Sequence, residues 1–242
     1  MTAAPPRLIA FDTSTERMAI ALQAPAGATL LDEPGGAAAS ATLLPQIRRL
    51  LAGAGLAHTD LDFVAFGRGP GAFTGLRTAC AVAQGLAFGI GKPVLAIDSL
   101  LIVAEDARLQ AGAAGPFDVG VAMDARMDEI YAAAYRFNGT AWETLAEPAL
   151  LALPALADAW RGLSLHAVAG SAWAAFGQRL QAPAPRVFAQ QQGRAAALLR
   201  LALRAAAAGQ GVDAAQALPL YLRDKVALTT REREAARAAA VP

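Results

Sequence analysis

The chain has 242 residues, a formal net charge of +1, one cysteine and two histidines. This length suits one large domain or two small ones, and either can bury a sizeable core. The charge gives no electrostatic case for nucleic-acid binding. One cysteine excludes a disulfide framework, and His58 and His166 have no further ligand at metal-binding spacing, so we expect no metal site. No uncharged apolar run reaches ~18 residues and no signal-peptide core opens the chain, so we expect a cytoplasmic protein without membrane contact.

The first 110 residues predict a β-meander followed by alternating helices and strands. Apolar runs at 8–11, 18–22 and 28–31 indicate three strands joined by tight turns. Leucines and Ile47 at helical spacing predict a helix that ends near Ala52. Pro45 fits only the first turn of a helix, so we expect this helix to start around Leu43 or Leu44. The later elements are a strand at 63–66, a helix at 76–90, a strand at 94–97 and a helix from a cap at 98 or 99 to about 109.

The opening pattern then returns after a Gly/Ala-rich joint at 111–116. A strand at 119–124 ends in aspartate, a strand at 129–135 follows, and Asn138-Gly139 is a hairpin signal. Helices and strands alternate through 154–160, 165–169, 187–188 and 194–208. This duplication predicts an α/β fold of two actin-like (ASKHA, RNase H-like) lobes, each a mixed β-sheet flanked by helices. We expect the lobes at residues 1–110 and 117–227 and a flexible tail at 228–242.

A glycine-rich turn from Phe66 to Arg77 separates a predicted strand from a predicted helix. This order directs backbone N–H groups toward a ligand and suits phosphate, with Thr74 as the expected N-cap. The turn matches neither G-x-x-x-x-G-K-[ST] nor G-x-G-x-x-G, so a purely structural turn is the competing interpretation. Asp12 likewise suits either an actin-like phosphate loop or an Asx turn. The candidate nucleotide or anion contacts are Asp12, Thr13, Arg68, Gly71, Thr74 and Arg77.

The helix expected at 76–90 has no polar face. Only Arg77, Thr78 and Gln84 are polar along it, and small residues are frequent. A helix that is apolar all round is buried on both sides. Either this helix crosses the middle of the domain, or its outer face meets another chain.

Four stretches resemble the TsaB (YeaZ) family, a glycoprotease-like branch of the actin/Hsp70/sugar-kinase superfamily. They are LIAFDTST at 8–15, GRGPGAFTGLR at 67–77, DARMDEIY at 124–131 and LYLR at 220–223. The resemblance implies two actin-like lobes, no cofactor and no catalytic centre of the chain's own. It implies a TsaD-like catalytic partner, a TsaE-like ATPase, and contact with tRNA only through the complex that forms N6-threonylcarbamoyladenosine beside the anticodon. The chain lacks the H-x-x-x-H motif of the catalytic subunit.

The family resemblance also implies where the partner docks. Its first two helices, here 43–52 and 76–90, form a bundle with the same helices of the partner, or with a second copy when the partner is missing. The expected interface residues are Leu43, Leu44, Ile47, Leu51, Phe73, Leu76, Cys80, Ala83, Gln84 and Ala87.

Two other functions stay open at this stage. An actin-like ATPase or small-molecule kinase could use Asp12 and the turn from Gly69 to Gly75, with Asp124 as the second carboxylate. A peptidase needs an activated nucleophile or a metal, and Cys80, within an apolar helix, is more typical of a packing residue.

Overall fold

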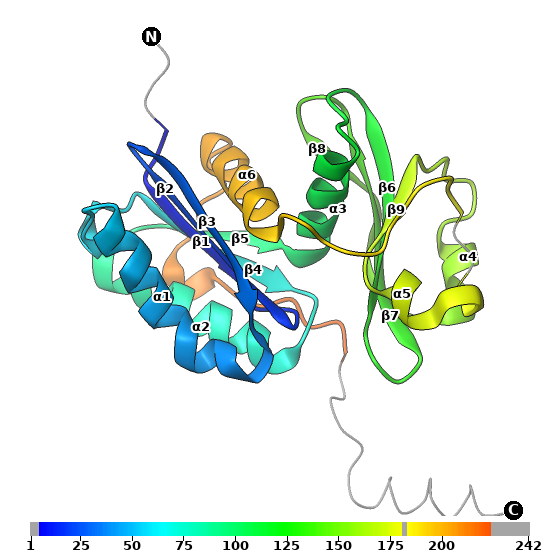
Figure 1. Ribbon diagram of the computed structural model, residues 1–242, viewed down its shortest axis with the longest axis horizontal. Coiled ribbons are helices and arrows are strands. Elements are labelled where there is room, and N and C mark those ends of the chain that lie inside the picture. Colours follow the sequence, from blue (N-terminus) through cyan, green and yellow to red (C-terminus); the bar gives the residue numbers. More distant parts are fainter. Residues whose placement is uncertain (1–4, 181–182, 224–242) are drawn as a thin grey trace, which may run out of the picture.

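The computed structural model describes residues 5–180 and 183–223, which form two lobes (Figure 1). The expected tail at 228–242 lies outside these residues. Each lobe is built on a five-stranded sheet, in the order β3-β2-β1-β4-β5 and β10-β9-β6-β7-β8. The α/β fold of two actin-like lobes is therefore confirmed.

The first sheet brings the polar ends of its central strands to one edge. Its strands are β1 (Leu8–Asp12), β2 (Arg17–Ala24), β3 (Gly27–Pro34), β4 (Phe63–Gly69) and β5 (Val94–Asp98). β1 pairs antiparallel with β2 and parallel with β4, and β4 pairs parallel with β5. The carboxyl ends of β1, β4 and β5 therefore meet, and in open α/β sheets ligand sites form at such an edge.

Helices cover both faces of this sheet, which explains why all of β1 is buried. α1 (Ala39–Gly53) and α2 (Phe73–Ile90) pack on one face, and α3 (Ser99–Gln110) and α6 (Arg194–Ala207) pack on the other. α3 also packs on β6 of the second lobe, so one helix serves both cores.

The second sheet repeats the meander. Its strands are β6 (Phe117–Asp124), β7 (Glu129–Phe137), β8 (Trp142–Ala152), β9 (Ala167–Ala169) and β10 (Val187–Phe188). The face away from α3 is covered by α4 (Leu156–Ala159) and α5 (Ala172–Phe176), around the rings of Trp160 and Trp173. The described residues also contain short 3₁₀ turns: η1 (Gly36–Ala38), η2 (His58–Asp60), η3 (Leu153–Ala155), η4 (Gly177–Arg179) and η5 (Ala214–Gln216).

Two predicted helix starts are wrong. α1 begins at Ala39, with Pro45 inside it. Proline removes the hydrogen bond to the carbonyl four residues back, but Ala41 and Pro45 are both exposed, so water can reach that carbonyl. α2 begins at Phe73, and its N-cap is Ala72 without a side-chain bond, so Thr74 does not cap the helix.

After the second sheet, the chain returns to the first lobe. α6 packs on β1 and β2, Val212 forms a bridge with Val94, and the Leu220 amide donates to the Arg68 carbonyl at 2.7 Å. Residues 194–220 thus lie against the sheet formed by the first 98 residues. The division of the chain into lobes at residues 1–110 and 117–227 stays a prediction. The return of residues 194–220 to the first sheet is a separate feature of the structure.

Candidate functional site

The turn after β1 and the glycine-rich turn after β4 touch backbone to backbone. The Thr13 hydroxyl donates to the Gly75 carbonyl at 2.7 Å, and the Ala72 amide donates to the Ser14 carbonyl at 2.8 Å. A Cβ added at Gly75 would lie 1.8 Å from the Thr13 carbonyl oxygen, and one at Gly71 would lie 2.5 Å from the Ser14 carbonyl oxygen. Glycine is required here because two main chains approach closely.

Asp12 is the centre of this contact, and its carboxylate is fully buried. One oxygen accepts from the Ser14 amide at 3.0 Å and its hydroxyl at 2.7 Å, and from Arg194 Nη2 at 3.0 Å and Nε at 3.2 Å. The other oxygen accepts from the Ser99 hydroxyl at 2.7 Å. Burial alone would raise the pKa of Asp12, but the Arg194 charge and these hydroxyl donors together hold that pKa below its usual value. Arg194 thus neutralises Asp12, the carboxylate that would belong to an actin-like phosphate loop.

The six candidate anion contacts separate into two groups. Asp12, Thr13 and Gly71 meet in the interlocked turns, as described above. Thr74 and Arg77 lie on the outer side of α2, and Arg68 is exposed at the end of β4. The Arg77 guanidinium lies 3.9 Å from the Phe73 ring centre, and its Nε donates to the Tyr221 hydroxyl at 3.2 Å. These six residues therefore do not converge on one ligand position.

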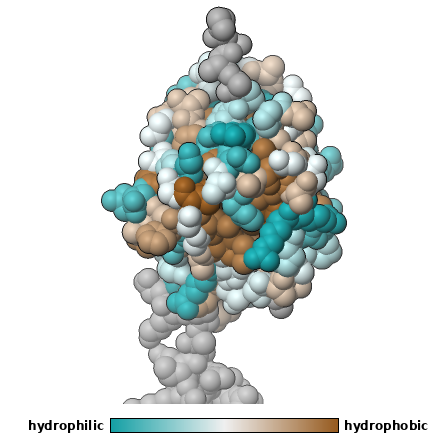
Figure 2. All heavy atoms as spheres, turned by 90° about the vertical axis from the view of Figure 1, so that its left-hand side faces the viewer, coloured by the Kyte–Doolittle hydropathy of each residue, from teal (hydrophilic) through white to brown (hydrophobic). Residues whose placement is uncertain are grey.

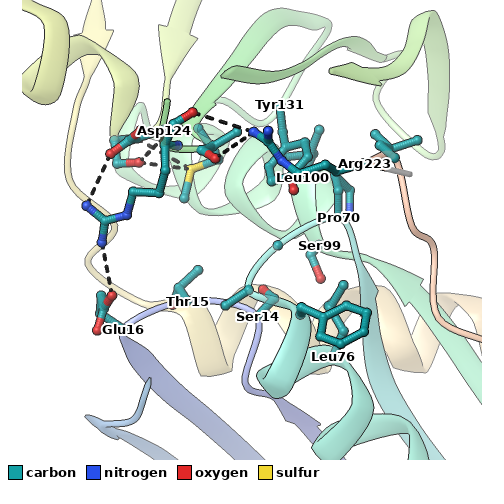
Figure 3. Close-up of a pocket in the computed structure, with 18 of the residues that line it drawn as sticks. Ser14, Thr15, Glu16, Pro70, Leu76, Ser99, Leu100, Asp124, Tyr131 and Arg223 are labelled. Atoms are coloured by element: carbon teal, nitrogen blue, oxygen red, sulfur yellow. Dashed lines mark hydrogen bonds and ion pairs between the residues drawn. The ribbon is translucent and has the colours of Figure 1, made fainter. Parts of the chain in front are cut away.

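A cavity of about 610 Å³ lies between the lobes, in the size range of small-molecule sites (Figure 3). Ser14, Thr15 and Glu16 line it from the first lobe, and Asp124 and Tyr131 line it from the second. Arg126 spans the mouth: its Nη2 donates to Glu16 at 3.2 Å and its amide donates to Asp124 at 2.7 Å.

The segment after Asp124 is conformationally unusual. Arg126, Met127 and Asp128 have φ values of 65°, 58° and 57°, the left-handed region that side chains disfavour. Arg223 fixes this turn: its Nη2 donates to the Ala125 carbonyl at 2.9 Å and its Nη1 pairs with Glu129 at 2.6 Å. The C-terminal LYLR stretch therefore links both lobes at the cavity mouth, and sequence reasoning had no signal for these φ angles.

The outer surface of α1 and α2 is the second candidate site. Figure 2 shows this side of the molecule, with apolar side chains gathered at its centre among hydrophilic ones. Most of the expected interface residues instead face the chain's own sheet. Seven of the ten are buried in the core: Leu43, Ile47, Leu51, Leu76, Cys80, Ala83 and Ala87. Leu44 is exposed, and Phe73 and Gln84 are half-buried.

The residues that do face outward form a stripe along α2. Thr74, Arg77, Ala81, Gly85 and Phe88 are exposed at helical spacing, and Phe88 is 83% exposed. A shallow hollow beside Gly85 and Phe88 is completed by Ala214 and Ala215 of η5. The helical period groups these residues on one side of α2. Both sides of the helix carry small apolar residues, so these residues do not indicate which side faces the sheet.

Groups suited to nucleophilic or metal chemistry are placed for packing. The Cys80 thiol donates to the Ala217 carbonyl at 3.2 Å, and burial raises its pKa, so the reactive thiolate is disfavoured. His166 Nδ1 accepts from the Asp118 amide at 3.0 Å and its ring stacks on Phe117. Within residues 5–180 and 183–223, no group of three or more His, Cys, Asp or Glu side chains could hold a metal, and no helix could cross a membrane.

Comparisons with known proteins agree with this architecture. A family model described as TsaD, tRNA N6-adenosine threonylcarbamoyltransferase, matches residues 34–231. The tRNA threonylcarbamoyladenosine biosynthesis protein TsaB of Escherichia coli is 30% identical over 91% of this chain and 96% of its own length. The TsaB protein of Haemophilus influenzae is 42% identical over 124 residues, about half of either chain.

Solved structures lead to the same family. YeaZ from Pseudomonas aeruginosa superposes with a TM-score of 0.80 at 39% identity, covering 90% of this chain and all of that one. A second structure, of a Pseudomonas aeruginosa protein with similarity to peptidase YEAZ, superposes with a TM-score of 0.81 at 40% identity and covers the same shares of both chains. The chain therefore belongs to the TsaB (YeaZ) family of tRNA threonylcarbamoyladenosine biosynthesis proteins.

Proposed function

We propose that this chain is the non-catalytic scaffold subunit of the complex that forms N6-threonylcarbamoyladenosine next to the tRNA anticodon. In this proposal it binds a TsaD-like catalytic subunit, a TsaE-like ATPase joins them, and tRNA meets the chain only through the complex. Without the catalytic subunit, a second copy of the chain can occupy the same surface.

The observation that carries the proposal is the outer face of α2. Ala81, Gly85 and Phe88 leave an apolar stripe exposed, on a helix whose other side is already anchored on β4. Small side chains let a partner helix approach closely, and Phe88 offers one large ring to bury. A specific interface of ~800 Å² per partner would cover such a face.

The contribution of Phe88 to the free energy of binding can be estimated from its exposure. Burying a fully exposed phenylalanine side chain stabilises a complex by about 1.5–3 kcal/mol. Since Phe88 is 83% exposed, Phe88→Ala should weaken binding roughly ten- to a hundredfold. The folding stability of the Phe88→Ala variant should change little, because the exposed ring contributes little to the chain's own core.

Reconstitution tests the proposal. The chain, the TsaD-like subunit and the TsaE-like ATPase of the same genome should together form the modified adenosine, and leaving out the chain should abolish the product. Gly85→Arg should prevent assembly, because the added side chain fills the space where the partner helix would lie. Gly85→Ala is the matched control, since no heavy atom lies within 4 Å of its added Cβ.

Buried positions cannot serve this test. Ala79 and Ala83 have no exposed surface, so Ala79→Glu or Ala83→Arg would disrupt the core before reaching a partner. Complex formation by Gly85→Arg at wild-type affinity, with normal product, would contradict docking through α2.

An actin-like ATPase or kinase is the second candidate, and the cavity between the lobes is the feature in its favour. The bonds that already engage Asp12 weigh against it. Calorimetry with MgATP on the isolated chain distinguishes the two functions: micromolar binding would support the ATPase, and no heat of binding would support the scaffold.

A further inference from the structure

Three hydrogen-bond donors converge on one sulfur atom in the wall of the cavity between the lobes. The Met123 sulfur lies 3.5 Å from the Ser171 amide, 3.8 Å from the Ser171 hydroxyl and 4.0 Å from Gln191 Nε2. Within residues 5–180 and 183–223, none of these three donors has another acceptor. A thioether sulfur is only a weak acceptor. This wall therefore holds more donor capacity than the atom at its centre can use.

The neighbouring contacts fix the direction of each donor. The Ser171 hydroxyl accepts from the Asp124 amide at 3.1 Å, so its own proton points elsewhere. The Gln191 Oε1 accepts from Arg194, which can only donate, so the NH₂ group of Gln191 is the part that faces the sulfur. Gly170 allows the close approach, because a Cβ added there would lie 3.0 Å from the sulfur. The donors are thus set around the sulfur by the fold itself.

Met123 is also within reach of a small solute. It is half-buried and lines the cavity. Met18, by contrast, is fully buried. Met127 lines the same cavity and is 69% exposed, and it has a single donor beside its sulfur, Arg223 Nη1 at 3.6 Å. Met123 therefore combines access from the cavity with donors from two segments of the chain.

We propose that Met123 is a reversible oxidation site, and that Ser171 and Gln191 bind the oxygen of its sulfoxide. A peroxide supplies this oxygen: the sulfur donates an electron pair to one peroxide oxygen, the O–O bond breaks and the S–O bond forms. The proton of the transferred oxygen passes to the leaving hydroxide and gives water. The sulfur is oxidised and the peroxide is reduced, and a methionine sulfoxide reductase reverses the change with thiols as the reductant.

Oxidation at this position strengthens a connection between the lobes. Met123 and Ser171 belong to the second lobe, whereas Gln191 also accepts from Arg194, which pairs with Asp12 at the end of β1. A sulfoxide oxygen is polar and accepts hydrogen bonds better than a thioether. Methionine oxidation usually disrupts packing. A sulfoxide that leaves the fold equally or more stable is therefore the distinguishing property of this site.

Treatment of the full chain with hydrogen peroxide tests the proposal. The parent for this test carries Met127→Leu, which removes the more exposed methionine of the cavity. Peptide mass spectrometry should find Met123 oxidised and Met18 unoxidised while the chain stays folded. The urea midpoint of the oxidised parent should equal or exceed that of the reduced parent. The same treatment of Met123→Leu/Met127→Leu subtracts any effect of oxidation elsewhere in the chain.

A substitution at Gln191 tests the residue assignment. Gln191→Glu keeps an oxygen toward Arg194 and replaces the donor with a second oxygen, which repels a sulfoxide. The effect of oxidation on the folding equilibrium constant should then become less favourable by about two- to tenfold, the range for one hydrogen bond. Gln190→Glu is the matched control: it makes the same charge change on an exposed side chain one residue earlier and should leave the effect of oxidation as in the parent.

Each outcome decides the proposal. Oxidation of Met123 without a lower midpoint in the parent, together with a loss confined to Gln191→Glu, would support it. Resistance of Met123 to peroxide in the folded chain would overturn it, as would a lower midpoint for the oxidised parent. Equal effects of oxidation in Gln191→Glu and Gln190→Glu would overturn it as well. None of these results bears on the proposed scaffold role, because assembly is not measured.

Discussion

Removing the Arg194 side chain should be among the most destabilising single changes in this protein. Arg194 is 2% exposed and joins α6 to the end of β1, 182 residues earlier in the chain. Arg194→Met keeps much of the apolar stem and deletes four hydrogen bonds, two to Asp12, one to the Ser14 hydroxyl and one to the Gln191 side chain. Asp12 would then be a buried carboxylate with no cation beside it.

The expected cost is about 3–5 kcal/mol, the range for breaking a buried ion pair by removing one partner. This is a large share of the ~5–15 kcal/mol that typically stabilises a domain. The double variant Asp12→Asn/Arg194→Met should lose less than Arg194→Met alone, because it no longer buries an unpaired charge. The difference between the two variants measures the coupling between these residues.

The loss should also depend on pH. In the wild type the pKa of Asp12 is lowered, so its stabilising contribution is present above the unfolded pKa of ~3.9 and is lost as pH falls through the folded value. Without Arg194, burial dominates and raises that pKa. The variant is then penalised most near neutral pH, and the penalty shrinks as acid protonates Asp12.

Urea unfolding at several pH values between about 4.5 and 7.5 measures these differences, with an unchanged m-value as the check that the same surface unfolds. Arg200→Met, an exposed arginine on the same helix, should change stability by less than about 0.5 kcal/mol. A loss in Arg194→Met as small as in this control, or one that grows toward low pH, would refute the assignment of Asp12 as a carboxylate held charged by Arg194.

Four further changes are measured by the same unfolding assay; two should destabilise the protein and two should stabilise it. Gly75→Ala should lower the free energy of unfolding by about 3 kcal/mol, because the added Cβ would overlap the Thr13 carbonyl oxygen. Gly85→Ala, whose Cβ would point into open space, should raise it by about 0.5–1 kcal/mol. Equal effects of the two substitutions would contradict this contrast. Tyr135→Phe should cost about 1 kcal/mol, since Asp98, whose pKa burial raises, loses the 2.7 Å bond that joins the lobes. Met127→Gly should gain about 0.5–1 kcal/mol by relieving a left-handed backbone, and a loss would argue against strain there.

The sequence predicted the architecture well because the repeated signals were strong. Each of the two β-meanders begins with a strand that ends in an aspartate, Leu8–Asp12 in the first lobe and Phe117–Asp124 in the second. The Asn138-Gly139 turn joins β7 to β8 as expected. Asp98 caps α3 by accepting from the Leu100 amide at 2.8 Å. These signals are local, so periodicity and turn chemistry are enough to find them.

The misses have a common cause, which is contact between segments that are distant in the chain. Thr74 was predicted to cap α2, yet the N-cap residue is Ala72, whose amide donates to the Ser14 carbonyl, 58 residues earlier. Nothing near Arg194 in the sequence indicates that it will pair with Asp12. The return of α6 and of Val212 to the first sheet is equally invisible, because a helix of alanine and leucine can pack on either lobe.

The two sides of α2 show why fold and site differ in predictability. Ala79 and Ala83 on the inner side and Ala81 and Gly85 on the outer side are chemically alike, so composition cannot say which pair meets the sheet. Charge does distinguish the sides, because a buried unpaired arginine costs several kcal/mol and Arg77 must therefore face outward. Reading the helix from Arg77 assigns Ala81, Gly85 and Phe88 to the exposed side by helical period alone. The one cation of α2 thus marks the exposed stripe, which is the stripe that we propose faces a partner.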